Sequence, residues 1–123
     1  MGKLVRGKVF SGVGEGAHYV ELYGDELTRV LGSPPYPGTL NVLLERCFYE
    51  LVERARAIVI QPPRRGLGAV YVYRGTVANI PVLVLKPAIT VYECRVVELV
   101  SSVNLREKLG LRDGDFIEVD VVE

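Results

Sequence analysis

Two side-chain oxygens follow a rigid corner of the chain and are the first candidates for chemistry in this sequence. Residues 34–38 contain three prolines, which hold the backbone extended, and Gly38 then permits a tight turn. Thr39 and Asn41 follow directly, and in an extended segment residues two apart point to the same side. A hydroxyl and a carboxamide presented together can bind a hard cation such as Mg²⁺ when phosphate groups supply the negative charge. The alternative is a proline-rich loop entering a strand, with both side chains bonded to local backbone.

A second candidate is the glycine-rich segment of residues 11–16, in which Gly12, Gly14 and Gly16 alternate with other residues. Without a Cβ in the way, the N–H groups of such a loop can approach phosphate oxygens. The spacing matches neither the phosphate loop that ends in Gly-Lys-Ser/Thr nor the dinucleotide fingerprint. A loose connection between two strands is the alternative interpretation.

Three further groups of polar residues are weaker candidates. Glu98 interrupts an apolar run, so its carboxylate must either point outward or find a partner. His18 is the only histidine, and a lone histidine beside a loop is more typical of a surface or packing role than of catalysis. Arg64 and Arg65 lie in a Pro- and Gly-rich loop, where they can either reach a phosphate or remain solvated.

Composition restricts the class of protein. The chain of 123 residues fits one domain, residues 1–123, with 49% hydrophobic and 24% charged residues. Its 15 Lys and Arg balance its 15 Asp and Glu, so the molecule as a whole has no basic field to attract nucleic acid. No apolar run is long enough to cross a bilayer. We therefore expect a cytoplasmic protein, monomeric, with neither nucleic acid nor a membrane as a partner.

The two cysteines, Cys47 and Cys94, are isolated, and no histidine stands near them at metal-binding spacing. In an intracellular protein such a pair is more typical of two buried thiols than of a disulfide. The sequence predicts free, buried thiols and leaves a disulfide open.

The elements that must position these residues are mostly short strands. Alternating or β-branched segments predict strands at 4–10, 17–22, 42–44, 57–60, 69–73, 77–85 and 116–121, and residues 90–100 are predicted as a loop followed by a strand. A tight turn is expected at Arg74-Gly75. Apolar spacing and capping residues predict short helices at 24–32, within 45–56, and at 104–110 with Asn104 as N-cap. Together these elements predict a mainly β protein, a small β-barrel with two or three short helices.

Three segments taken together resemble the archaeal CTP-dependent riboflavin kinases. They are residues 11–16, residues 35–41 with the sequence Pro-Tyr-Pro-Gly-Thr-Leu-Asn, and residues 105–115. The resemblance runs nearly from end to end, although residues 45–75 match only in pattern. Some members also have an N-terminal winged-helix DNA-binding domain, for which we expect no room in this chain.

The resemblance implies a cradle-loop β-barrel that transfers the γ-phosphoryl group of CTP to the 5′-hydroxyl of riboflavin, giving FMN and CDP. It implies that Thr39 and Asn41 hold Mg²⁺ and that Thr90 and Glu98 contact the flavin. Glu98 is then the candidate for gripping or deprotonating the riboflavin hydroxyl. The implied nucleotide-binding residues are Gly12, Val13, Gly14, Glu15, Gly16, Ala17, Val103, Asn104, Leu105 and Arg106. Family members often have a larger or charged residue where Ala17 stands, so a side-chain contribution is not expected there.

Two other functions remain open at this stage. A flavin- or nucleotide-binding module could use the same barrel without catalysis. Barrels that end in a helix, an Asp-Gly-Asp turn and an alternating strand are also similar to swapped-hairpin DNA-binding regulators, although the zero net charge argues against DNA as a partner.

Overall fold

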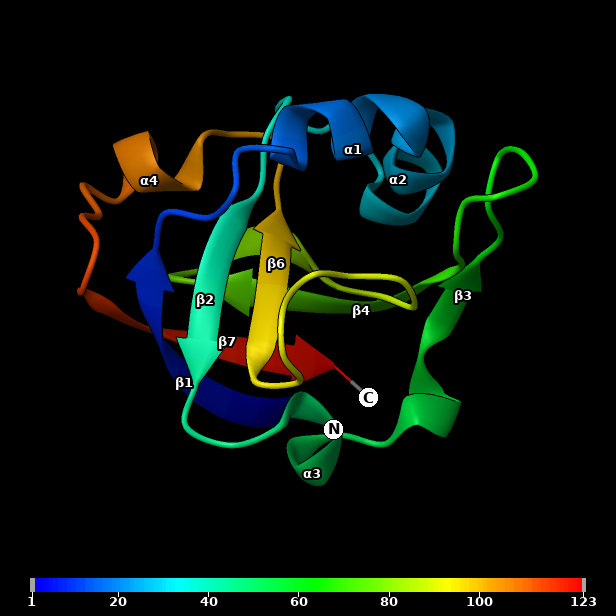
Figure 1. Cartoon of the computed structure of the whole chain (residues 1–123). Helices are drawn as coiled ribbons and strands as arrows, with labels where there is room; N and C mark the ends of the chain where they lie inside the picture. The colour runs from blue at the N-terminus through cyan, green and yellow to red at the C-terminus, as the bar shows by residue number, and fades with distance from the viewer. Residues whose placement is uncertain (1, 123) are drawn as a thin grey trace.

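The computed structural model describes residues 2–122 and shows a closed antiparallel β-barrel (Figure 1). The strands are β1 (Gly2–Phe10), β2 (Leu40–Leu44), β3 (Ile58–Ile60), β4 (Val70–Val77), β5 (Ile80–Pro87), β6 (Val96–Val100) and β7 (Phe116–Val122). Their order is β3-β4-β5-β6-β2-β1-β7, and an additional pairing of β4 with β7 closes a six-stranded barrel, with β3 attached to β4 outside it. The predicted mainly β barrel is confirmed.

Alternation of apolar and polar residues builds the barrel wall, because successive side chains of a strand point to opposite faces. In β7, Ile117, Val119 and Val121 are buried while the residues between them are exposed. Val9 and Val42, which are paired between β1 and β2, are fully buried in the same core. The interior is therefore filled by side chains from all around the barrel.

The helices are α1 (Gly16–Leu22), α2 (Gly24–Leu31), α3 (Phe48–Leu51) and α4 (Leu105–Lys108), with a 3₁₀ turn at Arg54–Arg56. α1 and α2 cover one end of the barrel, at the top of Figure 1. A second apolar cluster joins them to the sheet, in which Val20, Leu27 and Val30 share the core with Val72 and Leu85. There are thus four short helices where the sequence predicted two or three.

Two predictions of local structure are wrong. Residues 17–22, predicted as a strand, form α1. Val20 of α1 is followed at helical spacing by Tyr23 and by Leu27 of α2, and all three pack into the second apolar cluster, a pattern that the local alternation of residue types conceals. The turn predicted at Arg74-Gly75 lies instead at Ala78 and Asn79, which have φ of 48° and 68°. β4 continues through Gly75 because the barrel closes there, where a Cβ would stand 2.5 Å from the Asp120 carbonyl oxygen of β7.

The cysteines also differ from expectation. Both thiols are free, as predicted, but Cys94 is exposed and Cys47 is half-buried, so the prediction of two buried thiols is wrong. Cys47 is the residue that precedes α3, and Cys94 lies in the turn directly before β6.

Within residues 2–122, no helix combines the length and the apolar character that crossing a membrane requires.

Candidate active site

The glycine-rich loop connects β1 to α1 and packs closely against the segment that enters β2. A Cβ on Gly12 would overlap Tyr92 Oη and Asn41 Nδ2, and a Cβ on Gly16 would overlap Thr39 Oγ1 and lie 2.9 Å from Thr39 N. Glycine is required at both positions because these side chains occupy the space of a Cβ. Two segments that are separate in the sequence, and were singled out separately, therefore lie against each other.

Thr39 and Asn41 stand at the start of β2, where its neighbours are β1 and β6. Asn41 is paired with Phe10 on one side and with Glu98 on the other. Thr39 Oγ1 donates a hydrogen bond to Glu98 Oε1 at 3.1 Å. Asn41 Oδ1 is buried and has no hydrogen-bond partner among the described residues. A buried acceptor without a donor is unusual in a folded protein and indicates a place where a ligand can bind.

These groups line a cavity with a volume of about 570 Å³. This volume is within the range of small-molecule binding sites. The predicted site residues that line it are Gly12, Val13, Gly14, Glu15, Gly16, Ala17, Thr39, Asn41, Thr90, Glu98 and Arg106. The structure thus brings together the whole predicted phosphate loop, both predicted metal ligands and both predicted flavin contacts.

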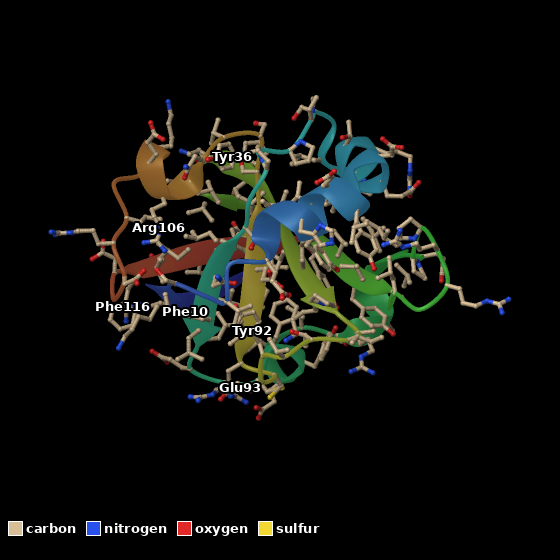
Figure 2. The ribbon with its side chains drawn as sticks, turned by 45° about the horizontal axis from the view of Figure 1, so that its top comes forward. Phe10, Tyr36, Tyr92, Glu93, Arg106 and Phe116 are labelled. Atoms are coloured by element: carbon tan, nitrogen blue, oxygen red, sulfur yellow. The ribbon has the colours of Figure 1, made fainter. Side chains whose placement is uncertain are left out.

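A smaller cavity of about 190 Å³ adjoins the first and shares Gly38, Thr39 and Arg106 with it. The remaining predicted nucleotide residues, Val103, Asn104 and Leu105, line this second cavity together with Tyr36. Asn104 caps α4 by accepting a hydrogen bond from Glu107 N at 3.2 Å, as predicted, and it also donates to Tyr36 Oη at 3.1 Å. Figure 2 shows Tyr36 and Arg106 on the side of the molecule where α4 lies.

Asp113 links the glycine-rich loop to α4 through two contacts. Its carboxylate accepts a hydrogen bond from Ser11 Oγ at 2.7 Å and forms an ion pair with Arg106 at 2.9 Å. The hydrogen bond from Ser11, assisted by the Arg106 charge, holds the pKa of Asp113 below its usual value. The guanidinium that lines both cavities is thereby held in place. The sequence predicts Asp113 only as part of the Asp-Gly-Asp turn, and its contacts with Ser11 and Arg106 appear only in the folded chain.

Glu98 is half-buried on the floor of the larger cavity. Burial raises the pKa of its carboxyl group, while the hydrogen bond from Thr39 and the positive charge of Lys86 oppose that rise. A carboxylate whose pKa is raised toward neutrality is better suited to accept a proton than an exposed one.

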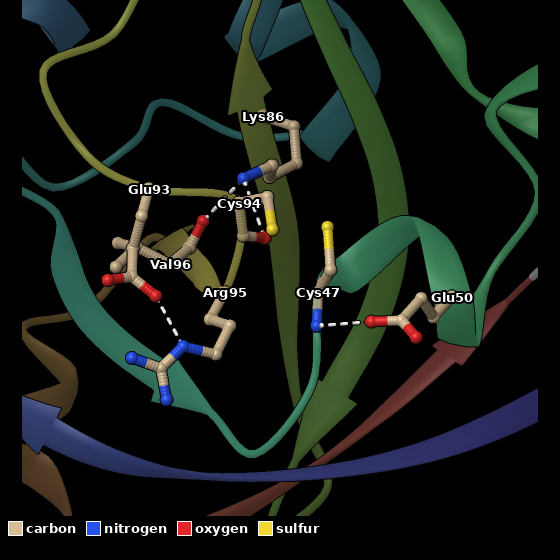
Figure 3. Close-up of polar contacts among 7 residues, drawn as sticks. All are labelled: Cys47, Glu50, Lys86, Glu93, Cys94, Arg95 and Val96. Carbon is tan, nitrogen blue, oxygen red and sulfur yellow. Dashed lines mark hydrogen bonds and ion pairs between the residues drawn. The ribbon is translucent and has the colours of Figure 1, made fainter.

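Lys86 anchors the segment that forms one wall of the cavity. Its buried ammonium group donates hydrogen bonds to the carbonyl oxygens of Cys94, at 3.3 Å, and Val96, at 2.7 Å (Figure 3). Burial lowers the pKa of Lys86. These bonds fix the point at which residues 88–95 join β6, two residues before Glu98.

The part of this wall that lines the cavity, residues 89–92, is mostly apolar. Ile89 and Val91 are exposed hydrophobic residues that line the cavity. Tyr92 packs edge-on against Phe10 with ring centroids 5.8 Å apart, and its hydroxyl accepts a hydrogen bond from Val13 N–H at 2.8 Å (Figure 2). An apolar wall beside a polar floor can bind a planar ring with one hydrophobic edge.

His18, Arg64 and Arg65 line neither cavity, and all three are exposed. Arg64 and Arg65 are therefore solvated loop residues in this structure, and His18 is a surface residue.

The donor set fits a magnesium ion that arrives with a nucleotide. Residues 2–122 contain no cluster of three or more His, Cys, Asp or Glu side chains able to hold a metal alone. Thr39 and Asn41 offer a hydroxyl and an unpaired carboxamide oxygen, the kind of neutral ligand that needs phosphate oxygens to complete a site for Mg²⁺.

Comparison with known proteins agrees with the resemblance found in the sequence. Residues 9–121 match the family model CTP-dep_RFKase, described as "Domain of unknown function DUF120". A protein of Staphylothermus marinus named riboflavin kinase is 40% identical over 119 residues, covering 97% of this chain and 92% of the relative. A riboflavin kinase of Aeropyrum pernix is 38% identical, covering 98% of this chain and 96% of the relative. The riboflavin kinase of Archaeoglobus fulgidus is 40% identical, and the chain spans only 54% of its length. This chain belongs to the CTP-dependent riboflavin kinase family.

Proposed function

We propose that this protein transfers the γ-phosphoryl group of CTP to the 5′-hydroxyl of riboflavin, giving FMN and CDP, with Mg²⁺ held by Thr39 and Asn41. Membership of the family and the name riboflavin kinase of its relatives support the reaction class. The observation that carries the proposal is that two cavities meet at Gly38, Thr39 and Arg106. One of them contains a glycine cradle and an apolar wall, and the other adjoins a capped helix end.

In this proposal the cytosine occupies the smaller cavity and the phosphates extend into the larger one. Residues 103–105 line this cavity, and the backbone N–H groups at the start of α4 would pair with the polar edge of the base, whereas a purine would leave some of them unpaired. Arg106 lies where the two cavities meet, so its charge is suited to the α- and β-phosphates. The amides of residues 12–16 surround the far end of the triphosphate, and no side chain of Gly12, Gly14 or Gly16 blocks the approach.

Riboflavin occupies the remainder of the larger cavity. Ile89 and Val91 cover the ring system, and Thr90 and Glu98 are the polar groups available to its hydroxyl-bearing side chain. Glu98 is in contact with Thr39, which places the proposed proton acceptor next to a proposed metal ligand. The acceptor hydroxyl and the γ-phosphate would then meet between these two residues.

Phosphoryl transfer through a loose transition state depends more on positioning and charge neutralisation than on covalent chemistry. Mg²⁺, which Thr39 and Asn41 would hold, would supply positive charge that neutralises the phosphates. The chain contributes fixed donors, namely the loop amides and Arg106, at the positions where negative charge develops. Glu98 orients the riboflavin hydroxyl and accepts its proton, for which its raised pKa is suited.

The test is to incubate the purified protein with riboflavin, Mg²⁺ and either CTP or ATP, and to separate the flavins by chromatography. We expect FMN and CDP with CTP and a much lower rate with ATP. Binding of CTP and riboflavin without FMN formation would show a binding module instead of a kinase. Equal rates with both nucleotides would contradict the assignment of the smaller cavity to cytosine.

A further inference from the structure

Tyr19 has a buried hydroxyl group to which the proposed mechanism assigns no role. Three buried side-chain polar atoms of the described residues have no hydrogen-bond partner, namely Tyr19 Oη, Asn41 Oδ1 and Tyr49 Oη. Asn41 and Tyr19 both line the larger cavity, whereas Tyr49 lines neither cavity. Asn41 is accounted for by the proposed metal site. Tyr19 is therefore the second residue lining this cavity whose buried side chain carries an unpaired polar atom.

The ring of Tyr19 is held in place by its neighbours. It stacks on Tyr23, one helical turn later, with ring centroids 4.6 Å apart and an angle of 28° between the planes. Tyr23 is itself only 4% exposed and donates a hydrogen bond to the Gly68 carbonyl oxygen at 2.7 Å. A hydroxyl on a ring that is fixed in this way cannot easily turn to reach water, so its lack of a partner persists until a ligand supplies one.

The hydroxyl can act only as a neutral group. Burial, followed by the neighbouring Tyr23 and Glu98, raises the pKa of Tyr19 far above its usual range. The proton therefore stays on the oxygen at neutral pH. Glu98 accepts a hydrogen bond from Thr39, and the Tyr19 hydroxyl finds no acceptor among the described residues.

The position of Tyr19 points to the flavin instead of the nucleotide. Tyr19 is absent from the smaller cavity, which we assign to cytosine. Its stacking partner Tyr23 bonds to Gly68, and a Cβ on Gly68 would lie 2.9 Å from Ile89 Cγ1. Tyr23, on which Tyr19 stacks, and Ile89 of the apolar wall thus meet at Gly68, on the side of the cavity where the flavin ring is expected.

We propose that Tyr19 Oη donates a hydrogen bond to an acceptor atom of riboflavin and is a positioning residue for that substrate. The inference rests on the proposed function, because it takes riboflavin as the ligand of the larger cavity. Tyr19 also explains how the cavity distinguishes a flavin from an apolar planar molecule, since the unpaired donor would remain unsatisfied with a ligand that has no acceptor.

The test compares Tyr19→Phe with Tyr49→Phe, which removes a buried and unpaired hydroxyl outside both cavities. Riboflavin binding is measured by quenching of flavin fluorescence, and CTP binding by calorimetry. A neutral hydrogen bond of ordinary strength predicts that Tyr19→Phe weakens riboflavin binding by about 3- to 12-fold. CTP affinity and the thermal midpoint of the ligand-free protein should not fall in Tyr19→Phe, and Tyr49→Phe should leave both affinities unchanged.

The outcomes separate this inference from the proposed function. Riboflavin affinity within twofold of wild type in Tyr19→Phe would overturn the inference, as would an equal loss of CTP affinity. If the wild-type protein binds riboflavin but forms no FMN, the kinase proposal fails, while a weaker riboflavin affinity in Tyr19→Phe still supports the hydrogen bond. If the wild-type protein binds no riboflavin, both proposals are wrong.

Discussion

Replacing Gly16 with alanine tests whether the glycine loop must lie against Thr39 for activity. Gly16 and Gly24 are each the first residue of a helix, and neither has a positive φ. A Cβ on Gly24 would meet nothing within 4 Å, whereas a Cβ on Gly16 would overlap Thr39. The two glycines are thus a matched pair that differs mainly in this contact.

The expected magnitudes follow from that contact. Alanine is favoured over glycine within a helix by roughly 0.5–1 kcal/mol, so Gly24→Ala should raise the free energy of unfolding by up to about that amount. In Gly16→Ala the Cβ would lie 2.9 Å from Thr39 N, where ordinary contact begins at 3.4 Å, so the backbone of Thr39 must retreat by about 0.5 Å and its hydroxyl by more. Such overpacking typically costs about 1–3 kcal/mol, and we expect a net loss of roughly 0.5–2 kcal/mol.

The effect on turnover should exceed the effect on stability. A displacement of about 1 Å in a positioning group can cost on the order of 100-fold in rate. We therefore expect Gly16→Ala to reduce FMN formation by about 10- to 100-fold and Gly24→Ala to retain the wild-type rate. Urea unfolding and initial rates at saturating substrates measure the two quantities. A Gly16→Ala protein that is folded and as active as wild type would refute the idea that Thr39 acts from its observed position.

Three further predictions concern the proposed catalytic groups. Thr39→Ala and Asn41→Ala should each lower kcat by about 100-fold or more, as removal of one transition-state stabiliser does, and initial rates near wild type would exclude them as metal ligands. Glu98→Gln should remove most of the activity while raising the thermal midpoint at pH 7. The reason is that burial raises the pKa of Glu98 above its ordinary value of 4.5, so the native state binds this proton more tightly than the unfolded chain does. The stability that the protonated Glu98 contributes is present below pH 4.5 and is lost as pH rises through the native pKa. The higher thermal midpoint of Glu98→Gln relative to wild type should therefore vanish below about pH 4.5. A higher midpoint that persists below that pH would contradict burial of the charge as its cause. Mg²⁺ alone should bind weakly because its two protein ligands are neutral, and micromolar affinity without nucleotide in calorimetry would contradict the site.

The fold was largely predictable because period-two alternation reports which face of a strand is buried. β7 and β1 have such alternation and were found at nearly their true limits. α1 was not found, since the packing that favours a helix involves Tyr19 and Tyr23 against distant strands. Gly75 was misread for a similar reason: its close approach to Asp120 exists only once the barrel has closed.

The candidate site shows the same division between local and long-range information. Gly12, Gly16, Thr39 and Asn41 could be proposed because residue type and spacing limit what each can do. Asp113 could not, because its partner Ser11 is 102 residues away. The contact between Tyr92 and Val13 spans 79 residues and likewise appears only in the folded chain. Sequence reasoning thus identified the groups with intrinsic chemistry and missed those that act by holding other groups.

The central claim is that the glycine loop and the pair Thr39 and Asn41 surround one nucleotide-bound metal ion. Paramagnetic line broadening by Mn²⁺ in place of Mg²⁺ tests it most directly, by following the backbone amide signals of the protein with and without CTP. We predict that Mn²⁺ and CTP together broaden the signals of residues 12–16 and 39–41, and that Mn²⁺ alone leaves them sharp. Broadening of only one of these two segments, or of neither, would contradict the claim that a single ligand joins them.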